Sequence, residues 1–165
     1  MTYTYQAEGS ASALADVPAG TWFDTNTQTS TQANHEYIML INEVDFERHI
    51  SLIDGTKFKV ERAGLYNFQF SAQFNNTDGG GNAAAVEVYI KKNGTAVANS
   101  GGKISITTNN REAIASWNYF LQLGATDYIQ LAWVTTNAGI NLVANSLITP
   151  GPAIPSLIVT MHQVA

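Results

Sequence analysis

The segment from Phe58 to Phe74 places aromatic side chains at every second position of an extended stretch. It reads FKVERAGLYNFQFSAQF, and a regular alternation begins after Gly64. The aromatic members of this alternation are Tyr66, Phe68 and Phe70, and the polar members are Asn67, Gln69 and Ser71. A period of two puts each set on its own face of a strand. The segment therefore predicts a strand half-buried in a β-sandwich with a large apolar interior.

The composition limits the classes of function. At 165 residues the chain is long enough for one domain with a sizeable core. Charged residues make up 13% of the chain, against about 25% in ordinary soluble domains, so Thr, Asn, Ser and Gln must supply most of the polar surface. The formal net charge is −5, and the eight Lys and Arg do not cluster. Binding to nucleic acid needs a basic stripe, so nucleic acid is not an expected partner.

The chain contains no cysteine, which excludes disulfides, a thiol nucleophile and thiolate zinc ligands. Its start, MTYTYQAEGS, lacks the basic residues and apolar run of a signal peptide. No stretch approaches the ~18 apolar residues of a membrane helix. We therefore expect a soluble protein without its own secretion signal and without a membrane partner, and the lack of cysteine favours a microbial or viral source.

Short alternating or apolar runs, separated by Gly, Asn, Asp and Pro, predict about ten strands and no helix. The runs lie at residues 20–27, 35–42, 48–53, 56–60, 65–75, 84–92, 103–108, 112–123, 128–135, 139–143 and 154–164. Asp54-Gly55 and Asn93-Gly94 predict tight hairpins, because both central positions of a type I′ turn need a positive φ. Strands at this spacing indicate an antiparallel sandwich or barrel.

The order of these motifs resembles the trimeric jelly-roll superfamily of tumour necrosis factor and of the globular head of the complement recognition protein. The second half of the complement head signature, Phe, five residues and then Gly-x-Tyr-x-Phe-x-Phe/Tyr, is matched from Phe58 through Gly64 to Phe70. The family's Lys-Asn-Gly hairpin resembles residues 92–94, its Gly-Asp strand resembles 126–131, and its final strand resembles 155–164.

The sequence departs from the animal members of this superfamily at several points. Ser51 stands where an aromatic residue or Leu is expected, Thr126 replaces the Gly of Gly-Asp, and neither a collagen stalk nor a membrane anchor is seen. The segments YNFQFSAQF, KKNG, SWNYFLQL and PSLIVTMHQV more closely resemble the versions of this domain that bacteriophage virions carry. The resemblance implies an antiparallel ten-strand jelly-roll sandwich over residues 20–165 that forms a homotrimer.

The resemblance also implies that some outward aromatic side chains are buried against neighbouring subunits. The candidates for this trimer interface are Tyr119, Tyr128, Gln130, Trp133, Tyr66 and Phe68, with Tyr89 as a further aromatic residue. For any one of them, the alternative is an ordinary place in the core. Residues 1–19 form an N-terminal arm, which is either a frayed terminus or a segment that pairs with another protein's sheet edge.

The sequence predicts no catalytic, cofactor or metal site. His35, His49 and His162 have no partner at metal-ligand spacing, and no Gly-x-Ser-x-Gly motif is present. Gly79 to Gly81 lack the Gly-Lys-Ser/Thr ending of a phosphate loop, and no loop has the pattern of a calcium site. Two carboxylates from distant strands could still serve glycoside hydrolysis, but nothing singles out a pair.

The leading functional prediction is a non-enzymatic virion structural protein of a bacteriophage, a trimeric decoration (cement) protein on the capsid surface. Its partner would be the major capsid protein, and its candidate anchor residues are Thr2, Tyr3, Thr4, Tyr5 and Gln6. The alternative is the receptor-binding tip of a tail fibre, which would recognise a host glycan or protein through residues 77–82 and 109–111 and Trp117. These loops contain no aromatic residue, which counts against a saccharide site there. A glycan-cleaving enzyme ranks third.

Overall fold

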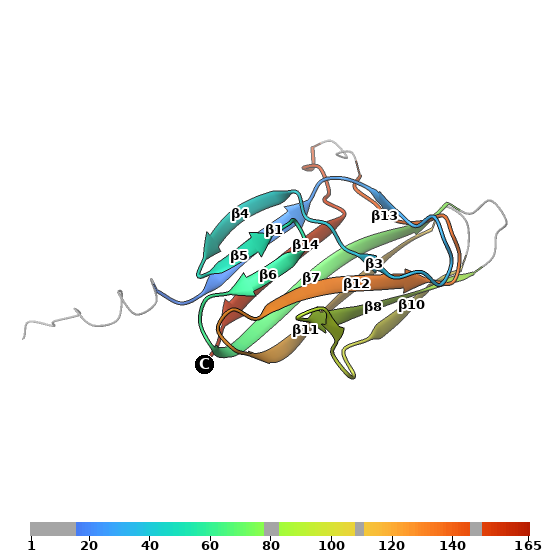
Figure 1. Cartoon of the computed structure of the whole chain (residues 1–165). Coiled ribbons are helices and arrows are strands. Elements are labelled where there is room, and N and C mark those ends of the chain that lie inside the picture. Colours follow the sequence, from blue (N-terminus) through green and yellow to red (C-terminus); the bar gives the residue numbers. More distant parts are fainter. Residues whose placement is uncertain (1–15, 78–82, 108–110, 146–149) are drawn as a thin grey trace, which may run out of the picture.

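The computed structural model describes residues 16–77, 83–107, 111–145 and 150–165, and within them the chain forms two stacked seven-stranded sheets (Figure 1). The first sheet contains β1 (Ala19–Asp24), β2 (Gln28–Thr29), β4 (Glu43–Arg48), β7 (Gly64–Asn76), β11 (Glu112–Leu123), β13 (Ile140–Leu142) and β14 (Leu157–Gln163). The second contains β3 (Tyr37–Ile38), β5 (Ile50–Ile53), β6 (Lys57–Val60), β8 (Ala84–Lys92), β9 (Thr95–Ala96), β10 (Gly102–Ile106) and β12 (Tyr128–Thr135). No helix in these ranges could cross a membrane.

The long strand β7 organises the first sheet. It pairs with β11 along one edge and with β14 and then β13 along the other, and the order continues from β14 to β1 and β4. The second sheet runs β10-β8-β12-β6-β5, with β3 beside β12 and β9 beside β8. All pairings between the named strands are antiparallel, so the predicted antiparallel β-sandwich is confirmed.

The turn chemistry also matches the sequence prediction. Asp54 and Gly55 have φ angles of 52° and 64° between β5 and β6, and Asn93 and Gly94 have φ angles of 50° and 81° between β8 and β9. Positive φ at both positions is the geometry that a type I′ turn requires. In the described ranges the chain forms fourteen strands, four of them only two or three residues long. The predicted runs at 35–42 and 139–143 contain the short strands β3 and β13, but the prediction missed the two-residue strands β2 and β9, and it also missed β4.

The aromatic side chains of β7 point between the sheets and form the core. Phe68 packs against Phe58 of β6 at a ring-centroid distance of 5.7 Å, and Trp22 of β1 meets the same Phe58 at 4.9 Å. Phe74 lies 5.4 Å from Trp133 of β12. Burying side chains of this size supplies most of the stabilisation of such a sandwich, on the order of 1.5–3 kcal/mol each.

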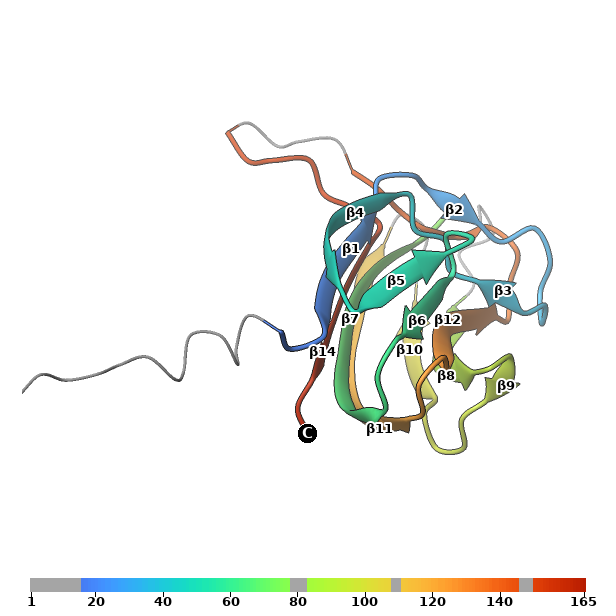
Figure 2. The ribbon, with the colours of Figure 1, turned by 60° about the vertical axis from the view of Figure 1, so that its left-hand side comes forward.

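The described chain begins against the domain, close to its C-terminus (Figure 2). Arg48 Nε donates to Val17 O at 2.6 Å, and Gln163 N donates to Pro18 O at 2.9 Å. Asp16 pairs with Arg62 at 2.9 Å, and hydrogen bonds from Arg62 and then His49 lower its pKa. Residues 16–19, which the sequence assigned to the arm, are thus held on the sandwich.

Candidate functional site

The outward surface of β1, β14, β7 and β11 is almost free of charge, and we refer to it as the uncharged face. Across the described strands β7, β11 and β14, Glu112 is the only Asp, Glu, Lys or Arg. The strand register arranges the outward side chains in rows across the sheet. One row is Ser116, Ser71, Ile158 and Phe23, and the next is Asn118, Gln69, Thr160 and Thr21. The face therefore presents small or neutral polar side chains together with apolar ones.

Three large apolar side chains stand exposed on this face. Ile114 and Phe120 of β11 are 62% and 59% exposed, and Ile158 of β14 is 40% exposed. Between them lies a shallow depression of about 210 Å³ whose lining includes Gln69, Ser71 and Ser116. Exposed apolar side chains grouped on one face, without charges between them, are typical of protein–protein contact surfaces.

The strand β11 also carries an open edge. Its twelve residues pair with β7 along one side, and in the described ranges no strand pairs with the other side. A long edge strand whose one charged residue, Glu112, stands at its first position invites pairing or packing with another chain. The open edge and the uncharged face meet at β11, so one partner could cover both.

The second sheet has a different outer surface, which is rich in ion pairs. Lys92 lies 2.8 Å from Asp127, and Lys57 lies 2.7 Å from Asp54. The pKa of Asp127 is lowered to about 2, first by its hydrogen bond from Lys92 and then by that from Asn93. Desolvating these charges would be costly. Of the two sheets, only the first presents an outer surface suited to burial.

Three predicted interface residues are in the core, and that part of the prediction is wrong. Tyr66 and Phe68 are fully buried and Trp133 is 1% exposed. They lie on the inward side of β7 and β12, and the Tyr66 hydroxyl donates to Arg62 O at 2.8 Å. Gln130 is only 8% exposed. These side chains have no free surface to offer a neighbouring subunit.

Tyr119, Tyr128 and Tyr89 remain half-exposed but do not share one surface. The hydroxyl of Tyr119 in β11 donates to Ser100 O at 2.5 Å, at the margin between the two sheets. Tyr128 and Tyr89 belong to β12 and β8 of the second sheet, and Lys57 Nζ lies 5.8 Å from the Tyr128 ring. A role for Tyr119 and Tyr128 in a trimer stays a prediction.

Sequence reasoning missed Ile114, Phe120 and Ile158 because it chose its interface candidates among other side chains, and in β11 it chose Tyr119 at an odd position. A shift of one residue exchanges every side chain between the two faces of a strand. The signal was present, since Leu121 and Leu123 mark the odd positions of β11 as inward. Phe120 and Ile114 then fall on the outward side with the other even positions.

The remaining predicted sites lie partly outside the described residues. The anchor candidates Thr2, Tyr3, Thr4, Tyr5 and Gln6 do so, as do residues 78–82 and 109–110 of the two proposed receptor loops. Trp117 packs edge-on against Phe70 at 4.8 Å and is half-buried. In the described ranges no group of three or more His, Asp or Glu could hold a metal ion.

The fold of this chain is similar to that of a solved structure. It superposes on the globular domain of the zebrafish complement 1qA protein with a TM-score of 0.56, covering 90% of this chain and 98% of that one at 12% identity. This chain has the complement-head fold. The resemblance inferred from the motifs is thus confirmed at the level of the fold, which is the jelly roll shared with tumour necrosis factor. No protein-family model and no curated protein matches the sequence.

Proposed function

We propose that three copies of the chain assemble around a three-fold axis through the uncharged face and the open edge of β11. The observation that carries this proposal is the near-absence of charge across β7, β11 and β14, where Glu112 is the one charged residue, together with the exposure of Ile114, Phe120 and Ile158. A face and an edge that differ in shape form a head-to-tail contact, which closes into a ring when the rotation permits.

We further propose that this trimer is a non-enzymatic structural protein of a bacteriophage virion, with capsid decoration as its role. The charge-poor composition, the neutral assembly face and the phage-like motifs support this role. Cyclic symmetry would bring the three copies of Asp16, where the described residues begin, to the same end of the trimer. Three weak contacts made at once with the major capsid protein would then reinforce one another.

Two measurements, made one after the other, test the proposal. Sedimentation of the purified chain at micromolar concentration should give a trimer, and a monomer would contradict the assembly. Cryo-electron microscopy of intact particles should then locate the trimer on the head. Density at a fibre tip, with binding to host cells, would instead support the receptor-binding alternative and overturn the decoration role.

A further inference from the structure

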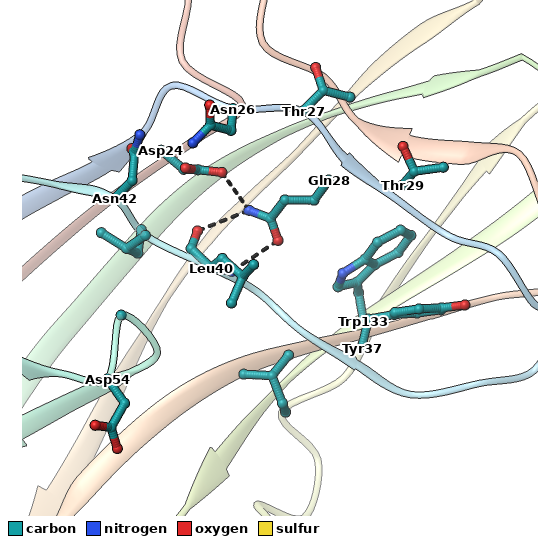
Figure 3. Close-up of a pocket in the computed structure, with 13 residues that line it drawn as sticks. Asp24, Asn26, Thr27, Gln28, Thr29, Tyr37, Leu40, Asn42, Asp54 and Trp133 are labelled. Atoms are coloured by element: carbon teal, nitrogen blue, oxygen red, sulfur yellow. Dashed lines mark hydrogen bonds between the residues drawn. The ribbon is translucent and has the colours of Figure 1, made fainter.

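A pocket of about 470 Å³ opens at one end of the sandwich, where the ring centroids of Tyr37 and Trp133 are 5.1 Å apart (Figure 3). Its polar groups are bonded to one another, since the Gln28 amide donates to Leu40 O at 2.9 Å and to Asp24 Oδ2 at 2.7 Å. Trp133 and Asp24 are each 1% exposed, so they offer a ligand no surface. A titratable side chain that is both exposed and without a partner lies instead on the uncharged face.

This side chain is His162 of β14. Burial alternates along the strand, and His162 is on the outward side with Ile158 and Thr160. It pairs with Asn67 of β7, which pairs in turn with Phe120 of β11. His162 and Phe120 therefore stand in one row of the uncharged face, two strand spacings or about 10 Å apart. Among the described residues, the His162 imidazole has no hydrogen bond and no ion pair.

The strands beside His162 hold few charged groups. β7 and β14 contain no Asp, Glu, Lys or Arg. In β11 the single carboxylate, Glu112, is far from Phe120 along the strand, about 26 Å at ~3.3 Å per residue. On the other side His162 pairs with Ala19 of β1, and the row ends at Arg48 of β4. The charged member of this row is therefore a cation, which disfavours a second positive charge.

The remaining carboxylates near this part of the sheet are paired or lie in other rows. Asp16, which precedes β1, is 2.9 Å from both Arg62 and His49. Asp24 is buried at the far end of β1. The carboxylates of β4 lie outside the row of His162 and belong to Glu43, Asp45 and Glu47. Within the described part of the chain, no carboxylate therefore stands beside His162 to compensate a proton on its ring.

Histidine is the side chain whose ordinary titration falls between pH 5 and 8. His162 is the one histidine on the strands of the uncharged face, because His35 precedes β3 and His49 follows β4. A neutral imidazole can be buried on assembly together with the amides and hydroxyls around it. An imidazolium without a carboxylate could be buried only at a high cost in desolvation. The charge state of this single side chain therefore decides whether the face is suited to burial.

We propose that acid dissociates the trimer by protonating His162 on the assembly face. This inference rests on the assembly proposed above and adds a regulation to it. The separated chain binds the proton more readily than the trimer, because only there does the imidazolium stay in water. Lowering the pH therefore favours separated chains, and raising it restores the trimer.

Fluorescence-detected sedimentation of a dilution series, at about pH 8 and about pH 5.5, tests this switch and reaches picomolar concentrations. Histidine side chains titrate near pH 6.5, so about one in ten stays neutral at pH 5.5. Because a trimer needs three neutral copies, its association constant should fall about 10³-fold. The concentration at which half the chains are assembled varies as the inverse square root of that constant, so it should rise about thirtyfold.

The carboxylates with shifted pKa values do not interfere between these two pH values. The pKa of each is lowered, first by a hydrogen bond from a Lys or Arg, and these residues are Asp16, Glu36 and Asp127. They stay charged at both pH values, so their contribution to folding and assembly is the same in both samples. The histidines are the side chains whose charge changes.

Variants assign the response to one side chain. His162→Gln keeps a neutral polar group at an exposed position and should assemble equally at both pH values. His162→Lys carries its charge at both, so it should need the higher concentration even at pH 8, and thermal unfolding checks that it stays folded. His49→Gln and His35→Gln are the matched controls, because both residues lie off the face. Both controls should keep the wild-type response.

The outcomes separate this inference from the assembly on which it rests. Equal assembly of the wild type at both pH values, or tighter assembly in acid, would overturn the switch and leave the trimer standing. The switch would also be refuted by a His162→Gln protein that keeps the wild-type response, or by a His162→Lys protein that assembles like wild type at pH 8. A wild-type chain that is monomeric at both pH values would contradict the assembly itself, and the switch would fall with it.

Discussion

Replacing Phe120 by Asp should dissociate the proposed trimer and leave each subunit folded. Phe120 is 59% exposed in the single chain, so its side chain contributes little to the core. It stands near one end of the uncharged face, where it pairs across the sheet with Asn67. On assembly a carboxylate at this position would have to be desolvated, and the described strands β7, β11 and β14 supply no Lys or Arg on the face to pair with it.

The size of the effect follows from the exposed area. An aromatic side chain offers about 200 Å², so 59% exposure leaves ~120 Å² of Phe120 to be buried, worth about 3 kcal/mol at ~25 cal/mol/Å². Three copies give about 9 kcal/mol for the whole trimer if packing covers each ring fully. Burying an unpaired carboxylate adds at least a few kcal/mol per copy. Since 1.4 kcal/mol is a factor of ten, the variant should be monomeric at micromolar concentration.

Sedimentation velocity on wild type and variant measures this directly, and thermal unfolding of the variant checks that the monomer stays folded. Ile53→Asp is the matched control, because Ile53 is also exposed, at 39%, but lies on β5 of the second sheet. It should remain trimeric. A Phe120→Asp protein that sediments as the wild-type trimer, or a control that dissociates equally, would refute the assignment of this face.

Further predictions concern the stability of the sandwich. Thr126 has a φ of 74°, so Thr126→Gly should raise the free energy of unfolding by about 1 kcal/mol, measured by urea titration, whereas Ala125→Gly at the neighbouring site should lower it. Asp127→Asn should lower the melting temperature at neutral pH; because the folded pKa is lowered to about 2, the wild type should lose this advantage as the pH falls from 3.8 toward 2. Gly102→Ala should cost about 1–3 kcal/mol, since its Cβ would lie 2.6 Å from the Trp117 ring; a melting temperature equal to wild type would contradict this packing.

The sequence predicted the local features well and the relations between distant segments poorly. β8, β11 and β12 were bounded correctly because alternation and turn residues act over a few positions. β4 was missed because nearly all its residues are exposed, so no buried alternation marks it. The stretch 35–42 forms only the two-residue β3, since most of it spans the end of the sandwich as irregular chain.

The candidate sites depended on those distant relations. The pocket requires Tyr37 to lie opposite Trp133, which the pairing of β3 with β12 determines and no local pattern reveals. The interface prediction chose mainly aromatic residues, and half of these, Tyr66, Phe68 and Trp133, belong to the core. The sequence does show that three long strands contain almost no charged residues. These strands form one uncharged surface only because β11, β7 and β14 lie side by side in the sheet.

The polar half of the β7 alternation is therefore as informative as its aromatic half. Tyr66, Phe68 and Phe70 would fill the core of any such sandwich, whatever surrounds the molecule. Their partners on the outward side could have been Lys or Glu, which suit a face that stays in water. In this chain the outward positions are Asn67, Gln69 and Ser71. Neutral amides and hydroxyls can be buried against another protein at much lower cost than charges when they find hydrogen-bond partners there. The same preference for uncharged outward side chains recurs in β11 and β14. A sheet face that stays in water does not need it, whereas a face that is buried in an assembly does.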